Sequence, residues 1–478
     1  MTVMHRWGGG DRSPGRGLTP EMADLAIIGG GAAAATMLAA LAHEPGAGPI
    51  SVLWVAPEGE DGRGVAYRTQ DPAHRLNVRA ERMSLRADRP GDFVEFLAAA
   101  NGHADPRAFM PRRSYGEYLS VRAAESARSL GAQRWPVRAV SAYRDHGWRI
   151  GGSDGQWRRA SHLVLALGPE PMKAPAVVDA ELLARGIYRV DPYAWVEQPR
   201  SPGALKQVWI LGSGLTAVDL ALTVASVHPG AQIHLLSRHG ALPASHTDAA
   251  PASDPLAPAA TFPPISRLLR DLRACCKSAG DWRGPLDGLR AGTADRWQRW
   301  SASEQRRFLR HARWAWDRAR HRMAPEVARA VSALRTSGQL HVHRGRLLAA
   351  ENQNGAALIQ WRPRGLEERH TARADLVLQA TGLDTSVSAS STPLLRSLLD
   401  QGLACPDPLD LGLAVDPAQR LLDAQGRVDP QAHVLGALAR GCRFECIAIP
   451  EIRTTAATIA AGLRASRAHA PAALAPET

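Results

Sequence analysis

The chain has 478 residues, of which 45% are hydrophobic and 22% are charged. This composition excludes an intrinsically disordered protein and predicts two or three domains. Basic side chains outnumber acidic ones by 58 to 46, but the arginines are dispersed and accompany no nucleic-acid-binding motif, so we expect no nucleic-acid partner. No apolar run approaches the ~18 residues that span a bilayer, so we expect no membrane association. The five cysteines lack metal-ligand spacing, which favours free thiols in a reducing cytoplasm and no metal site.

The first ordered element follows a Gly- and Arg-rich segment, residues 1–23, which we expect to be a disordered leader. Asp24–Ile28 predicts a buried strand that leads straight into a helix through a glycine turn of the form G-x-G-x-x-A. Such a turn lets a pyrophosphate approach the backbone at a helix N-terminus. A tight strand–helix turn without a ligand is the alternative. The candidate dinucleotide-binding residues of this turn are Gly29, Gly30, Gly31, Ala32 and Ala33.

The second strand, Ile50–Val55, has no acid at its end, where a dinucleotide-binding unit usually places one for the adenosine ribose. Either Glu58, a few residues later, contacts that ribose, or the contact is absent. The next stretch, GRGVAYRTQDPAHRLNVRAERMS (62–84), is polar and Arg-rich where a crossover helix is usual. Further along, residues 91–99 and 114–130 predict helices, and 161–168 predicts a buried strand stopped by glycine.

A second strand–turn–helix unit begins at Gln207 and repeats the G-x-G-x-x-A pattern. Two such units predict two dinucleotides, and the usual pair is a flavin and a nicotinamide coenzyme. Its second strand ends in Ser237-Arg238, where NAD-specific folds place an acid and where an arginine accommodates a 2′-phosphate. These two residues therefore favour NADPH over NADH, with an ordinary solvated arginine as the alternative. The candidate coenzyme-binding residues of the turn are Gly212, Ser213, Gly214, Leu215 and Thr216.

Residues 265–335 are polar, Arg-rich and Trp-rich with a helical period, and we expect them to be a helical insertion. Its tryptophans form a core or, alternatively, a cap that faces the substrate. The hydrophobic strand that ends in Ala-Thr-Gly at Gly382 predicts the return of the chain to the first domain. A last helix has Pro450 at or near its first turn.

Several motifs along nearly the whole chain carry a resemblance to one family. They are GRGVAYRTQDPAHRLNV, FMPRRSYGEYL, GSGLTAVD, SRHGALPASH, DWRGPLDGLR, RRFLRHARWAWDRARHRMAP and RGCRFECIAIPEIRTTA. The chain resembles the bacterial FAD/NAD(P)-binding family of two-dinucleotide-domain flavoproteins. More remotely it is similar to flavin-dependent N-hydroxylating monooxygenases, which reduce FAD with NADPH and then form a C4a-hydroperoxide with O2.

The resemblance implies an α/β fold with two Rossmann-like dinucleotide-binding domains. The FAD-binding domain is discontinuous, comprising residues 24–200 and 383–465. The NADPH-binding domain, residues 201–382, is inserted between these parts and contains the helical insertion 265–335. The tail, 466–478, is expected to be disordered.

The flavin-domain interpretation also predicts a role for residues 62–84, which would cross over the cofactor. Asn77 would pass beside the isoalloxazine ring and donate a hydrogen bond to flavin or substrate, which makes it the candidate catalytic residue. An asparagine that merely turns a loop is the alternative. The remaining candidate cofactor contacts are Gly62, Arg63, Gly64, Leu76, Thr381, Gly382, Ile449 and Pro450.

The expected function is that of an FAD- and NADPH-dependent monooxygenase that acts on a small molecule, with O2 as co-substrate. A flavin oxidoreductase that passes electrons to an organic acceptor or partner protein is one alternative. A non-catalytic redox sensor is another, which the second glycine turn with Ser237-Arg238 disfavours. A homo-oligomer is compatible with the sequence.

Overall fold

The computed structural model describes residues 22–44, 48–170, 172–198, 205–248, 254, 263–384 and 386–468. The predicted disordered leader therefore lies outside the described residues, apart from its last two positions. Most of the predicted tail lies outside them too, although the last helix continues to Ala468.

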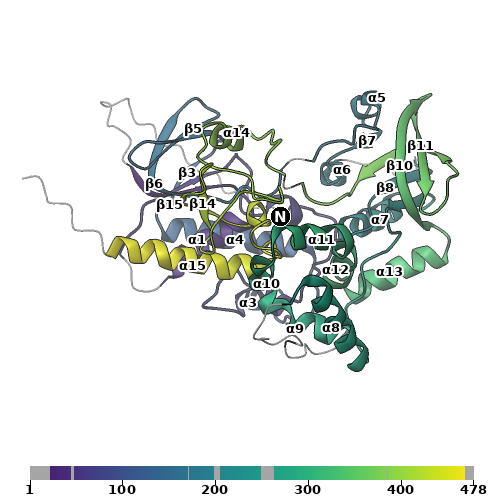
Figure 1. Ribbon diagram of the computed structural model, residues 1–478, viewed down its shortest axis with the longest axis horizontal. Helices are drawn as coiled ribbons and strands as arrows, with labels where there is room; N and C mark the ends of the chain where they lie inside the picture. The colour runs from purple at the N-terminus through teal and green to yellow at the C-terminus, as the bar shows by residue number, and fades with distance from the viewer. Residues whose placement is uncertain are drawn as a thin grey trace, which may run out of the picture.

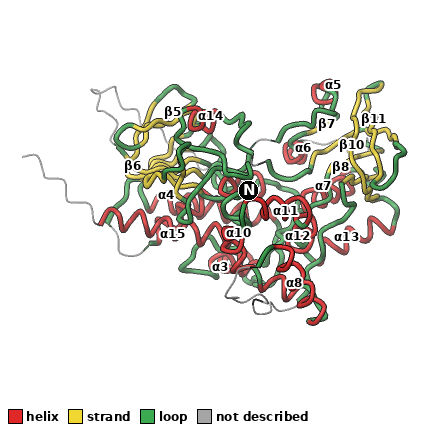
Figure 2. Tube along the Cα trace, viewed as in Figure 1, coloured by secondary structure: helices red, strands yellow, loops and turns green. Residues whose placement is uncertain are grey.

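Two separate sheets divide the molecule into two lobes (Figures 1 and 2). The first sheet has the order β14-β15-β6-β1-β2-β3, with β4 and β5 attached to β6. Its central strands β15, β6, β1, β2 and β3 are parallel. The bounds are β1 (Ala23–Ile28), β2 (Val52–Val55), β3 (Gln133–Trp135), β4 (Ala139–Arg144), β5 (Trp148–Gly152), β6 (Trp157–Leu165), β14 (Arg420–Leu422) and β15 (Val428–Val434).

The second sheet has the order β12-β11-β10-β9-β8-β13-β7. Strands β10, β9, β8, β13 and β7 are parallel, and β11 and β12 add an antiparallel edge. The bounds are β7 (Tyr188–Arg189), β8 (Gln207–Leu211), β9 (Gln232–Ser237), β10 (Leu340–Gln353), β11 (Ala356–Pro363), β12 (His370–Ala374) and β13 (Leu376–Gln379). Both sheets have the open doubly wound form, so the predicted two-domain α/β fold is confirmed.

Helices cover the sheets as this fold requires, because apolar strands such as β1 and β8 are buried on both faces. The first lobe contains α1 (Ala32–His43), α2 (Gly64–Tyr67), α3 (Asp92–Asn101), α4 (Arg112–Ser129), α14 (Pro393–Asp400) and α15 (Ile449–Ala468). The second contains α5 (Ala180–Ala184), α6 (Pro192–Glu197), α7 (Leu215–Val227) and α13 (Pro325–Thr336). In the first lobe, α1 packs between α4 and α15, and their apolar faces form one continuous core.

The first domain boundary lies earlier than predicted. Strand β7 pairs with β13 in the second sheet, and Val178 forms a bridge with Ala350 of β10. The predicted boundary between residues 200 and 201 is therefore wrong, because a short strand before it already completes the second sheet. The two connections between the lobes lie side by side, since Glu170 N donates to Asp384 O at 2.8 Å.

The helical insertion is shorter than predicted. Helix α13 packs against α7 and β10, so it is the crossover helix between β9 and β10 and belongs to the second domain. The predicted range 265–335 therefore joined the insertion to this helix. The insertion proper lies between the lobes at the lower centre of Figure 1 and contains α8 (Ile265–Ser278), α9 (Arg283–Gly288), α10 (Thr293–Arg299), α11 (Ala302–His311) and α12 (Arg313–Arg320).

Candidate functional site

The first glycine turn lies at the carboxyl end of β1, where the strand order reverses between β2 and β6. Gly29 has φ +135°, and a Cβ there would lie 2.2 Å from Ala166 O, so only glycine fits. A Cβ on Gly30 would lie 2.3 Å from Cβ of Glu60. In an open α/β sheet this switch point is the ligand-binding crevice.

The N-terminus of α1 is left open for an anion. Its first turn contains no acidic side chain, and Gly31 provides no side-chain cap. Two other loops approach the turn: a Cβ on Gly64 would lie 3.2 Å from Gly31 Cα, and one on Gly436 would lie 3.4 Å from Ala33 Cβ. Free N–H groups and the positive end of the helix dipole suit a pyrophosphate here, with Ala32 and Ala33 in the first turn.

Glu60 places a carboxylate beside this turn, and the predicted role of Glu58 stays a prediction. Glu58 and Glu60 are both exposed after β2, and a Cβ on Gly30 would meet Glu60 Oε2 at 2.6 Å. Arg134 fixes the loop by donating to Glu60 O at 2.7 Å, and it lies over the Trp54 ring at 3.9 Å. The sequence pattern did not single out Glu60, because this residue lies beyond the strand end where an acid was sought.

The second glycine turn has the same construction at the end of β8. Gly212 has φ +130°, and a Cβ there would lie 2.0 Å from Ala380 O. A Cβ on Gly214 would meet nothing within 4 Å, so the space above this residue is open. Helix α7, which begins at Leu215 and Thr216, lacks a side-chain cap and an acid in its first turn. This turn therefore also suits a phosphate.

Ser237 is tied directly to the second glycine turn. Its Oγ lies 2.8 Å from Ser213 Oγ and accepts a hydrogen bond from Gly240 N at 3.0 Å. Arg238, the next residue, is exposed. The structure thus brings the predicted residues Ser213 and Ser237 together.

More positive charge gathers beside Arg238 than the sequence indicated. His239 stacks on Trp314 with ring centroids 4.4 Å apart, and its Nδ1 accepts from Arg364 Nη1 at 2.8 Å. Burial lowers the pKa of His239, and the charges of Arg364, Arg238 and Arg344 lower it further. Arg344 and Arg364 come from a distant part of the chain, so no local sequence pattern could have identified them.

Side chains of the polar stretch 62–84 take part in the contact between the lobes. Arg68 Nε lies 2.8 Å from Glu197 Oε1 of α6, and His74 Nε2 lies 2.9 Å from Thr223 Oγ1 of α7. Arg79 pairs with Asp248 at 2.7 Å. The hydrogen-bonding side chains after α2 therefore meet the second domain, a role that sequence analysis missed.

Candidate residues at the start of this stretch lie near the first glycine turn. Gly62 N donates to Gly30 O at 2.8 Å, and Arg63 Nε lies 3.2 Å from Asp61 Oδ2. Leu76 is only 2% exposed and belongs to the apolar core of the first domain. A flavin contact of Leu76 would therefore come from its backbone.

Asn77 is held through its backbone. Its carbonyl oxygen lies 2.9 Å from His246 Nε2, on the segment that follows β9. Among the described residues its side-chain amide has no hydrogen-bond partner, and the residue is partly exposed. The amide is thus available to a ligand.

A buried ion pair lies beneath this interface. Arg112 Nε lies 3.2 Å from Asp219 Oδ2, and Asp219 is 3% exposed. The charge of Asp219 raises the pKa of the Arg112 guanidinium in spite of its burial. Asp219 therefore has a packing role between the domains.

The remaining candidates lie at the ends of other elements. Thr381 and Gly382 are exposed just after β13, and Ile449 and Pro450 begin α15, with Ile449 2% exposed. The Pro450 position in the first turn agrees with the sequence-based expectation.

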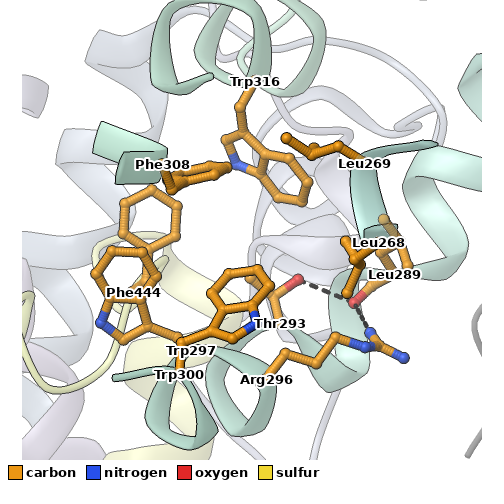
Figure 3. A pocket seen from close by; sticks show the side chains of 10 residues that line it. All are labelled: Leu268, Leu269, Leu289, Thr293, Arg296, Trp297, Trp300, Phe308, Trp316 and Phe444. Atoms are coloured by element: carbon orange, nitrogen blue, oxygen red, sulfur yellow. Dashed lines mark hydrogen bonds between the residues drawn. The ribbon is translucent and has the colours of Figure 1, made fainter. Parts of the chain in front are cut away.

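The insertion encloses a small apolar pocket against the loop that precedes α15 (Figure 3). Aromatic rings of Trp297, Phe308, Trp316 and Phe444 line it, and its volume is about 30 Å³, which suffices for a water molecule but not for a benzene ring. Trp297 is 1% exposed and donates to Gly441 O at 2.6 Å, so this tryptophan is a core residue.

Comparison with known proteins agrees with this geometry. Residues 26–170 match the model of a family described as FAD-NAD(P)-binding. This range begins in β1 and includes the first glycine turn, the 62–84 stretch and β6. No curated protein matches the chain significantly.

Solved structures resemble nearly the whole chain. An ornithine N-hydroxylase from Kutzneria sp. 744 has a TM-score of 0.65 at 16% identity, with 94% of this chain and 100% of that chain covered. An L-lysine 6-monooxygenase from Pseudomonas syringae has 0.64 at 17%, with 94% and 100% covered. A thioredoxin reductase from T. acidophilum has 0.53 at 12%, with 93% and 99% covered. At these identities the likeness shows the shared fold.

No helix among the described residues combines the length and the apolar character needed to cross a membrane. In the same part of the chain, no three His, Cys, Asp or Glu side chains come together as metal ligands would. All five cysteines lie in that part and are free thiols.

Proposed function

We propose that this chain is an FAD- and NADPH-dependent oxidoreductase, and specifically a monooxygenase of a small-molecule substrate. The observation that carries the proposal is the pair of glycine turns, each at the switch point of its own sheet with an uncapped helix N-terminus. The family match over residues 26–170 supports FAD at the first turn. The likeness to the two amino-acid hydroxylases supports the oxygenation.

The residues present suit the two cofactors. FAD would place its pyrophosphate on Gly29–Gly31, against the loop of Gly64, and Glu60 would take the role proposed for an acid at the adenosine end. NADPH would place its pyrophosphate on Gly212–Gly214. When FAD is bound, the chemistry that it supplies is to accept a hydride from NADPH and to react with O2.

The chain's own contribution is binding, orientation and exclusion of water. Ser237 and the guanidinium groups of Arg238, Arg344 and Arg364 would bind the 2′-phosphate, because planar guanidinium groups form charge-assisted bonds with phosphate oxygens. Asn77 would donate its side-chain N–H to flavin or substrate. The insertion, packed against the loop before α15, would shield the reacting groups from solvent.

A reductase that does not insert oxygen is the second candidate, and the likeness to thioredoxin reductase favours it. The T. acidophilum thioredoxin reductase shares the fold at a lower TM-score than the hydroxylases. The two candidates differ in the step after flavin reduction: a monooxygenase inserts oxygen into its substrate, whereas a reductase passes the electrons to another acceptor.

The test is stopped-flow spectroscopy of the purified chain loaded with FAD. NADPH should bleach the flavin absorbance faster than NADH does at equal concentration. Reoxidation by O2 in two phases, with a spectrally distinct species between them, would support the monooxygenase. Single-phase reoxidation would favour the reductase, and a chain that binds no FAD would exclude both.

A further inference from the structure

Residues 241–248, called here the strap, connect the coenzyme end of the second domain to the first domain. The strap follows β9 and begins beside the second glycine turn, where Ser213 Oγ lies 2.8 Å from both Ser237 Oγ and Ala241 O. Its first residue is therefore bonded to a side chain that, in the proposed function, faces the coenzyme.

The middle of the strap is fixed to the chain that leads into α13. Ala244 N donates to Arg318 O at 3.0 Å, and Ala244 O accepts from Met323 N at 2.7 Å. His246 N then donates to Met323 O at 2.9 Å. These bonds form a short ladder, so the backbone of His246 has a defined position relative to the second sheet.

The far end of the strap reaches the loop of Asn77. The His246 ring lies 4.8 Å from the Phe109 ring, and its Nε2 lies 2.9 Å from Asn77 O. Asp248 pairs with Arg79, two residues after Asn77, at 2.7 Å. Because a carbonyl oxygen can only accept, Nε2 of His246 must carry the proton.

His246 holds this hydrogen bond as a neutral imidazole. Burial lowers its pKa to about 4, so it remains uncharged at neutral pH. On the other side, Leu76 N donates to Met110 O at 2.8 Å. The peptide group before Leu76 is thus fixed by the first domain and the one after Asn77 by the second, and together they limit the directions in which the Asn77 side chain can point.

We infer that His246 is a positioning residue, which aims the Asn77 side chain from the coenzyme domain. The inference rests on the proposed function and adds to it a physical link between the coenzyme-phosphate end and the flavin-side loop. Reduction of the flavin would then proceed at full rate only when both ends of the strap are in place. An orientation error of about 1 Å can cost about 100-fold in rate.

The test uses two substitutions at one position in the FAD-loaded chain. His246→Phe keeps a ring on Phe109 but removes the N–H donor, whereas His246→Gln keeps an N–H donor. We expect His246→Phe to slow flavin reduction by saturating NADPH about tenfold, equivalent to about 1.4 kcal/mol, and His246→Gln to restore most of that rate. His103→Phe, at an exposed histidine, should leave the rate unchanged.

A second readout does not depend on turnover. Amide hydrogen exchange across residues 76–80 should be faster in His246→Phe than in the wild type, and intermediate or unchanged in His246→Gln. Wild-type reduction rates in His246→Phe, or equal losses in both variants, would overturn the inference while the proposed function stands. If the wild-type chain bound FAD but NADPH did not reduce it, the proposed function would fail instead.

Discussion

His74 Nε2 lies 2.9 Å from Thr223 Oγ1 across the contact between the two domains. The bond is one link in a chain: Thr69 Oγ1 lies 2.9 Å from His74 Nδ1, and Thr223 donates to the Asp71 carboxylate. Every link is satisfied when His74 is neutral with its proton on Nε2. Burial, which lowers the pKa of His74, favours that neutral form.

Removal of the Thr223 hydroxyl should weaken the domain contact. Thr223→Val keeps the shape but leaves buried His74 Nε2–H without its acceptor, so we expect a loss of about 1–3 kcal/mol in the free energy of unfolding. Urea titration followed by tryptophan fluorescence measures it. Thr458→Val, at an exposed α15 hydroxyl bonded only within its own helix, is the matched control. Equal free energies of unfolding for both variants would show that the hydrogen bond between His74 and Thr223 does not stabilise the protein.

Asn77→Ala should affect turnover far more than folding. The side-chain amide has no hydrogen-bond partner among the described residues, so its loss should change the free energy of unfolding by less than about 0.5 kcal/mol. We expect NADPH-dependent flavin turnover to fall at least about tenfold, since a donor aimed at the reacting groups contributes on this scale. A variant with wild-type turnover would assign Asn77 a loop role only.

The arginines beside Ser237 should determine coenzyme preference. Arg238→Gln and Arg364→Gln should each raise the KM for NADPH about 10- to 100-fold, because a hydrogen bond to a charged group contributes about 1.5–3 kcal/mol. The KM for NADH should change little, because NADH lacks the 2′-phosphate. Arg307→Gln, at an exposed position of the insertion, should leave both constants unchanged. Parallel changes for both coenzymes would refute 2′-phosphate recognition at this site.

Stability should fall with acidification because of His433. Burial lowers the pKa of this β15 histidine to about 4, whereas a histidine in the unfolded protein has a pKa of about 6.5. Between these values the unfolded state binds a proton that the folded state excludes, so unfolding becomes easier as pH falls. The slope is up to about 1.4 kcal/mol per pH unit for this group. His433→Phe should flatten the curve of urea midpoint against pH, and an unchanged slope would show that His433 titrates normally.

Several features followed from local sequence alone. The turns at Gly29 and Gly212 were predictable because a strand, a left-handed glycine and a helix follow one another within a few residues, and their geometry is fixed by backbone sterics. The repetition of that unit predicted two dinucleotides, and the family resemblance implied the two-domain α/β fold. The strands bounded by glycine and the position of Pro450 were likewise predictable from the local sequence.

Tertiary structure alone decided where the 62–84 stretch points. Its polar side chains suggested a cofactor-lining loop, yet many of them, including Arg68 and His74, meet α6 and α7 of the second domain. The same holds for the domain boundary, since β7 joins a sheet whose other strands follow it, and for Arg364, which reaches His239 from a distant part of the chain. Backbone sterics act over a few residues and are readable in sequence, whereas buried polar groups take whichever partner the packed domains bring to them.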